Sequence, residues 1–99
     1  MIFINHLNVI VMNNETFLKQ LELDYLARFR AMSANELIEC FNREVGSRGW
    51  TGSRSAYLSA LHRAFESLEM QLDPLVFTPS GLSLNIKLTV EGDCICGVE

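Results

Sequence analysis

The sequence predicts an α+β domain in which three helices pack on one face of a small antiparallel sheet. Apolar residues recur at the spacing of a helix surface through much of residues 14–70, and they alternate with polar residues over residues 82–90. Hydrophobic residues make up 48% of the 99-residue chain, which is enough to close one core. We therefore expect a single domain spanning residues 1–99, made of these helices and a C-terminal β-hairpin or meander.

The first segment, residues 2–11, alternates as a strand with one wet face would. Its apolar side consists of Phe3, Leu7, Val9 and Val11. Met12 would also serve as a translation start, so residues 1–11 are either a strand that joins the sheet or a loosely attached extension.

A helix is expected from residue 14 to about residue 32, with Asn13 or Asn14 as its N-cap. Its apolar stripe consists of Phe17, Leu18, Leu21, Tyr25, Phe29 and Met32. Leu23 and Leu26 fall toward the opposite side of the same helix. They indicate a second contact surface, or they are simply exposed leucines of the kind that many surfaces carry.

A second helix is predicted to begin after Ser33, because Ser33 and Glu36 have the spacing of a capping box. Gly46 can adopt the left-handed conformation that ends helices. The predicted buried face consists of Leu37, Ile38, Phe41 and Val45. Cys40 lies off the centre of that face, and we interpret it as a small packing residue.

A third helix is expected to begin near Thr51 or Ser53 and to close at the segment Gln71 to Pro74. Its stripe consists of Tyr57, Leu58, Leu61, Phe65 and Leu68.

The strands follow. After residues 75–78 and a turn at Pro79-Ser80-Gly81, residues 82–90 are predicted to form one continuous strand that pairs with the segment containing Cys94 and Cys96. A three-residue loop would turn both cysteines and Val98 to the core, whereas a two-residue loop would bury Ile95 and turn the thiols outward. The sequence favours the three-residue loop, because it buries three apolar side chains instead of one.

The net charge and the number of cysteines argue against several classes of protein. A net charge of −4 argues against general binding to nucleic acid or to an anionic membrane surface. No run approaches the roughly 18 apolar residues of a membrane span. The odd number of cysteines favours a reducing cytoplasm over a disulfide framework. Cys94, Cys96 and Cys40 lack the spacing of a structural zinc site, so no metal and no cofactor are predicted.

The segment from Gly46 to Gly52 is the one place where glycines, a helix N-terminus and arginines come together. Free backbone amides, the positive end of a helix dipole and guanidinium groups all attract an anion, so this segment is a candidate anion site. Its candidate residues are Arg43, Arg48, Trp50, Thr51, Ser53 and Arg54. The simpler interpretation is a helix–helix corner whose glycines serve turn geometry. The segment matches no nucleotide-binding loop, and it exceeds the roughly three- or four-residue turn of a DNA-binding helix-turn-helix.

These observations lead us to expect a non-enzymatic binding or adaptor protein that acts through protein contacts, with a second copy of itself and an unidentified protein as partners. The exposed leucines of the first helix and an open sheet edge suggest a homodimer. The alternative is a ligand-sensing or nucleic-acid-associated module that binds an anionic group at the glycine corner. A third function, a small enzyme centred on His62 and Glu66, would need a pocket beside the third helix.

Overall fold

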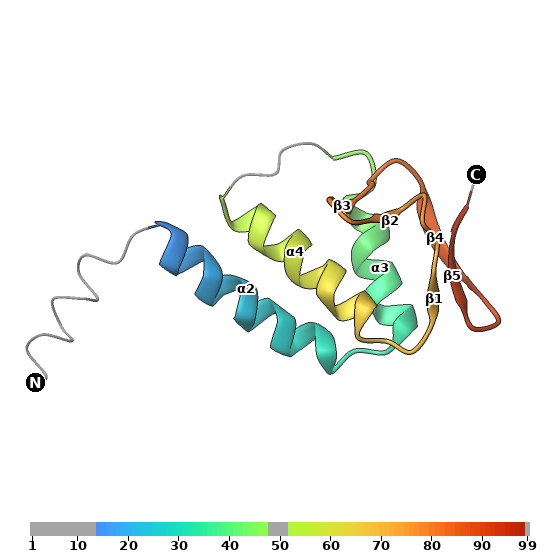
Figure 1. Ribbon diagram of the computed structural model, residues 1–99, viewed down its shortest axis with the longest axis horizontal. Helices are drawn as coiled ribbons and strands as arrows, with labels where there is room; N and C mark the ends of the chain where they lie inside the picture. Colours follow the sequence, from blue (N-terminus) through green and yellow to red (C-terminus); the bar gives the residue numbers. More distant parts are fainter. Residues whose placement is uncertain (1–13, 48–51, 99) are drawn as a thin grey trace, which may run out of the picture.

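The computed structural model describes residues 14–47 and 52–98 (Figure 1). The helices are α2 (Asn14–Arg30), α3 (Ala34–Glu44) and α4 (Gly52–Glu66). The three helices are confirmed, but α4 ends at Glu66, earlier than the predicted close at Gln71 to Pro74, where Gln71 and Leu72 form a strand. The strand or extension predicted for residues 1–11 lies outside the described residues.

Five short strands follow the helices: β1 (Gln71–Leu72), β2 (Phe77–Thr78), β3 (Gly81–Leu82), β4 (Lys87–Glu91) and β5 (Cys94–Val98). In the larger sheet the order is β1-β5-β4, with β5 antiparallel to β4 and parallel to β1. A separate antiparallel pair joins β2 and β3. The α+β class is therefore confirmed, and the sheet is mixed where an antiparallel one was expected.

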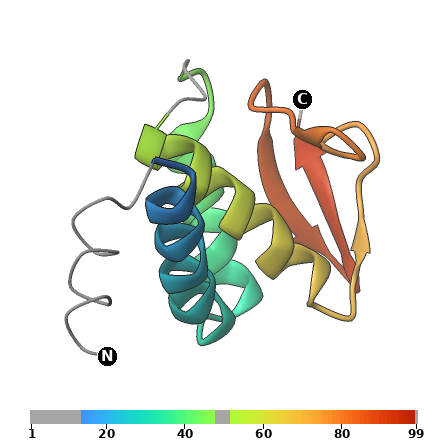
Figure 2. The same ribbon diagram turned by 60° about the vertical axis from the view of Figure 1, so that its left-hand side comes forward.

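The helices and the larger sheet form two layers, with the helices on one side of β4 and β5 (Figure 2). α2 packs along α4, and α3 contacts both α4 and β4. The residues that lose all contact with solvent come from both layers, among them Phe41, Phe65, Leu58 and Ile95. Phe41 and Phe65 meet edge to face, with their ring centroids 6.3 Å apart.

The buried side of α2 is rotated from the predicted stripe. Leu26, which we expected on the outer side, is only 3% exposed, whereas Phe17 is 51% exposed. Leu23 is exposed as predicted. The rotation has a physical cause: Tyr25 and Phe29 both pack edge to face on Tyr57 of α4, which turns Leu26 into the core.

The start of α3 is confirmed in detail. The Ser33 hydroxyl accepts a hydrogen bond from the Glu36 amide at 3.2 Å, and the Glu36 carboxylate accepts one from the Ser33 amide at 2.8 Å. At the other end Gly46 has a φ of +84°, as the expected helix terminator should. The Gly46 amide donates to the carbonyl of Leu84 at 2.8 Å, so the end of α3 is tied to the strand region.

The predicted continuous strand over residues 82–90 is wrong. β3 ends at Leu82 and β4 begins at Lys87. Between them the Ser83 amide donates to the carbonyl of Val76, and the carbonyl of Leu84 accepts from Gly46, both at 2.8 Å. These two hydrogen bonds take the place of the regular bonds to a neighbouring strand that a continuous strand would have made. Leu84 and Leu88 are nevertheless buried in the core, as predicted.

The favoured three-residue hairpin loop is also wrong. Glu91 pairs with Cys94 and Val90 with Ile95, which leaves Gly92 and Asp93 as a two-residue loop. Gly92 has a φ of +64°, and glycine at the first loop position suits a type II′ turn. In this register Ile95 is fully buried and both thiols lie on the opposite face.

Candidate functional site

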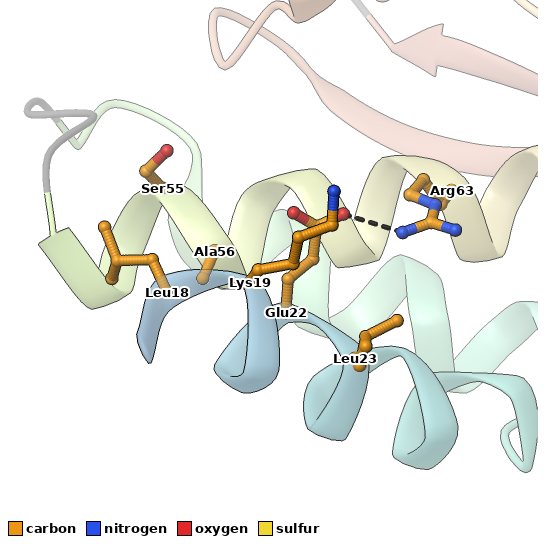
Figure 3. Close-up of a pocket in the computed structure, with 7 residues that line it drawn as sticks. All are labelled: Leu18, Lys19, Glu22, Leu23, Ser55, Ala56 and Arg63. Carbon is orange, nitrogen blue, oxygen red and sulfur yellow. Dashed lines mark hydrogen bonds and ion pairs between the residues drawn. The ribbon is translucent and has the colours of Figure 1, made fainter. Parts of the chain in front are cut away.

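One hollow is a groove between α2 and α4, which we call the α2–α4 groove (Figure 3). It has a volume of about 510 Å³. α2 contributes Leu18, Lys19, Glu22 and Leu23, and α4 contributes Ser55, Ala56 and Arg63.

An ion pair crosses this groove. A guanidinium nitrogen of Arg63 lies 2.8 Å from a carboxylate oxygen of Glu22, and the dashed line in Figure 3 marks the contact. Because the Arg63 side chain is 47% exposed, solvent screens the pair and its contribution to stability is small. The groove thus combines an exposed leucine with charges of both signs. Of its lining residues, sequence reasoning had proposed only Leu23 as part of a contact surface.

The predicted anion site is brought together only in part. Arg43, Ser53 and Arg54 line one hollow of about 390 Å³, which we call the Tyr57 hollow. Its remaining lining residues are Tyr25, Glu44 and Tyr57. Arg48, Trp50 and Thr51 lie outside the described residues.

Arg54 is engaged by its own fold. Its guanidinium lies 2.6 Å from the carboxylate of Glu44 and also donates to the Ser47 hydroxyl. An anionic ligand would have to compete with Glu44 for this cation. The arrangement therefore offers less positive charge than the arginine spacing predicts.

Arg43 takes part in a different contact, since its guanidinium donates to the Cys40 thiol at 3.3 Å. This hydrogen bond raises the pKa of Arg43. Burial, followed by the neighbouring Cys40, raises the pKa of Tyr57 to about 12, so Tyr57 stays neutral at physiological pH. Cys40 itself is buried, as its predicted packing role requires.

His62 and Glu66 lie one helical turn apart on α4, with 3.6 Å between the imidazole Nε2 and a carboxylate oxygen. His62 also lines a hollow of about 320 Å³ with Ser55, Ser59 and Ser80. In the described part of the chain no hydrogen bond joins these hydroxyls to His62. The enzyme hypothesis stays a prediction with a hollow but without an assembled nucleophile and base.

Two polar side chains that sequence reasoning missed hold the sheet. Asn42 on α3 bonds both backbone groups of Leu88, and Asp73 accepts from the amides of Gly97 and Leu75, each at 2.9 Å. The backbone bonds of Gly97 and then Leu75 lower the pKa of Asp73. Asp73 precedes a proline, which is a turn signal that could have indicated its role.

Among the residues described, none of the helices has the length and apolarity needed to cross a bilayer. Nor does any group of three or more His, Cys, Asp or Glu side chains there have the arrangement of a metal site. Comparisons with protein-family models, with curated proteins and with solved structures gave no significant match.

Proposed function

We propose that this chain is a small non-enzymatic binding protein that acts through protein contacts at the α2–α4 groove, and that one of its partners is a second copy of itself. The observation that supports this function is Leu23, which is 45% exposed at the edge of the groove. Apolar side chains rimmed by charges are typical of protein contact surfaces.

A second copy suits the groove because its charges are mixed. Lys19 and Arg63 supply positive charge, and Glu22 supplies negative charge. In an isologous contact the same surface serves on both subunits, so Lys19 of each copy can face Glu22 of the other while the leucines meet. An unidentified protein partner would use the same exposed leucine.

Two other arguments for a dimer, the exposure of Leu26 and an open sheet edge, are weaker in the structure than in the sequence. Leu26 belongs to the core, and the edge strand β4 is bonded by Asn42 at Leu88. The proposal of a dimer therefore depends on the α2–α4 groove and not on Leu26 or the sheet edge. We also propose a cytoplasmic location, since the cysteines Cys40, Cys94 and Cys96 are all free thiols.

The test is the molar mass in solution, measured by light scattering coupled to gel filtration from low to high micromolar concentration. We expect a dimer, and we expect Leu23→Lys to shift it to a monomer while circular dichroism stays unchanged. The matched control is Leu75→Lys, because Leu75 is 77% exposed and does not line the groove. A monomeric wild type, or equal loss of mass in both variants, would refute dimerisation through the groove.

The alternative function, recognition of an anionic group, is favoured by the grouping of Arg43, Ser53 and Arg54 around the Tyr57 hollow. Its test is a titration with inorganic phosphate, nucleotides and short DNA, followed through Trp50, the only tryptophan of the chain. We expect a saturable change that an Arg48→Ala/Arg54→Ala double variant loses. A flat titration would remove the anion site.

A further inference from the structure

Cys94 and Cys96 occupy the face of β5 that points away from the helices. They are two residues apart on one strand, so both side chains project to the same side, opposite the buried Ile95. Each thiol is half-buried, and the two Sγ atoms lie 2.7 Å apart. The sulfurs are therefore in direct contact.

The neighbouring strands hold this pair in place. β5 is the central strand of its sheet, and Cys94 pairs with Glu91 of β4 and with Gln71 of β1. Cys96 pairs with Thr89 of β4. A regular ladder thus holds both cysteines side by side, and the two-residue hairpin loop places them on the outer face.

The surroundings of Cys96 hold the proton on its thiol. The hydrogen bond with Cys94, together with burial and the nearby acidic groups of Glu91 and Asp73, raises the pKa of Cys96 to about 11. Cys96 therefore keeps its proton at neutral pH. This assigns Cys96 the role of the second thiol in any exchange reaction, since only a thiolate attacks a disulfide.

We propose that Cys94 and Cys96 form a redox-active dithiol, which closes to an intrastrand disulfide by exchange with small disulfides such as oxidised glutathione. The Cys94 thiolate attacks one sulfur of the oxidant, forms a mixed disulfide and releases one glutathione thiolate. Cys96 then loses its proton to solvent and attacks the Sγ of Cys94, which releases the second glutathione. The protein loses two protons and two electrons, and the oxidant is reduced to two thiols.

Strand geometry makes this disulfide easy to reduce. Alternate residues of an extended strand have Cα atoms about 6.6 Å apart, near the upper limit of about 6.8 Å for disulfides. Closing the bond pulls on β5 between its two neighbours. Strained disulfides are more oxidising than relaxed ones, so reduced glutathione should reopen this one.

A metal site fits these residues less well. Two thiolates on one tetrahedral zinc ion lie about 3.8 Å apart, given a Zn–S distance of about 2.3 Å, which is well beyond the observed contact. No third ligand joins the pair among the described residues. The donor set and its spacing therefore favour a bond between the sulfurs.

The experiment uses the full chain, incubated with an excess of either oxidised or reduced glutathione, blocked with iodoacetamide after unfolding, and digested with trypsin. Cleavage after Lys87 places Cys94 and Cys96 in one peptide and leaves Cys40 in another. In excess oxidised glutathione we expect the first peptide to escape alkylation at both cysteines and to lose the mass of two hydrogen atoms. Cys40, which is buried, should be fully alkylated, and reduced glutathione should restore alkylation at all three positions.

Serine variants identify the steps. Cys96→Ser should accumulate a glutathione adduct on Cys94, Cys94→Ser should form much less adduct, and Cys40→Ser should behave as the wild type. Circular dichroism of each variant checks the fold. Complete alkylation of Cys94 and Cys96 in excess oxidised glutathione would overturn the proposal, as would a disulfide that involves Cys40 or links two chains.

Discussion

Asn42 gives the sharpest test of how the two layers are joined. Its amide oxygen accepts from the Leu88 amide at 2.7 Å, and its amide nitrogen donates to the Leu88 carbonyl at 3.1 Å. Because β4 is an edge strand, these backbone groups have no strand neighbour on that side. The Asn42 side chain acts there as one residue of an additional strand, and it also protects the edge from pairing with another chain.

The expected cost of Asn42→Ala follows from this geometry. The substitution removes two hydrogen bonds, each with a net contribution of about 1 kcal/mol. Full desolvation penalties do not apply, since Asn42 is half-buried and water can reach part of the site. Alanine has a higher helix propensity than asparagine, which adds about half a kcal/mol to the free energy of unfolding. We therefore expect a loss of about 1.5 kcal/mol in the free energy of unfolding, or roughly 6–12 °C in Tm for a chain of this size.

The assay is urea unfolding followed by far-UV circular dichroism. The matched control is Asn35→Ala, because Asn35 lies exposed on the same helix, and we expect that variant to be as stable as the wild type or slightly more stable. Asn42→Asp keeps the acceptor for the Leu88 amide and loses the donor, so it should fall below the wild type as well. The reasoning fails if Asn42→Ala changes stability by no more than Asn35→Ala does.

Three further predictions concern local packing and charge. A Cβ on Gly97 would overlap Ile86 Cδ1 and lie 3.1 Å from its Cγ1, so Gly97→Ala should cost about 1 kcal/mol. Ile86→Val removes that Cδ1 and should reduce the cost, which a double-mutant cycle by urea unfolding measures. The lowered pKa of Asp73 contributes stability that is complete above the ordinary value of 3.8 and is lost as pH falls below it. The urea midpoint should therefore decline less steeply in acid for Asp73→Asn than for the wild type, and equal slopes would contradict this. Ser33→Ala should cost about 1 kcal/mol through loss of the capping box, and Tm measured by circular dichroism checks it; an unchanged Tm would show that the box adds nothing.

Local signals were sufficient where the chain interacts with its near neighbours. The capping box of Ser33 and Glu36 and the left-handed Gly46 need only residues three or so positions away, and the structure confirms both. The buried side of α2 was only partly predictable. Its rotation toward Leu26 depends on the rings of α4, and helical period alone does not say which neighbour a helix will meet.

The candidate site shows the same division. Arg43, Ser53 and Arg54 do share one hollow, as their proximity to one corner predicts. The sequence could not show that Glu44 already neutralises Arg54, because opposite charges ten residues apart meet only through the packing of two helices. The α2–α4 groove likewise exists only once those helices lie side by side.

By itself, the sequence determined the α+β class, the three helices, the start of α3 and the exposure of Leu23, because side-chain period and capping act over a few residues of one segment. Tertiary structure alone decided that the strand predicted over residues 82–90 breaks, that Asn42 bonds the edge at Leu88 and that the thiols of Cys94 and Cys96 face outward. The first two outcomes turn on hydrogen bonds between groups far apart in the chain, Gly46 with Leu84 and Asn42 with Leu88, and the third on the hairpin register that buries Ile95. These long-range bonds, and the core that Ile95 enters, exist only when the helices have packed against the strands.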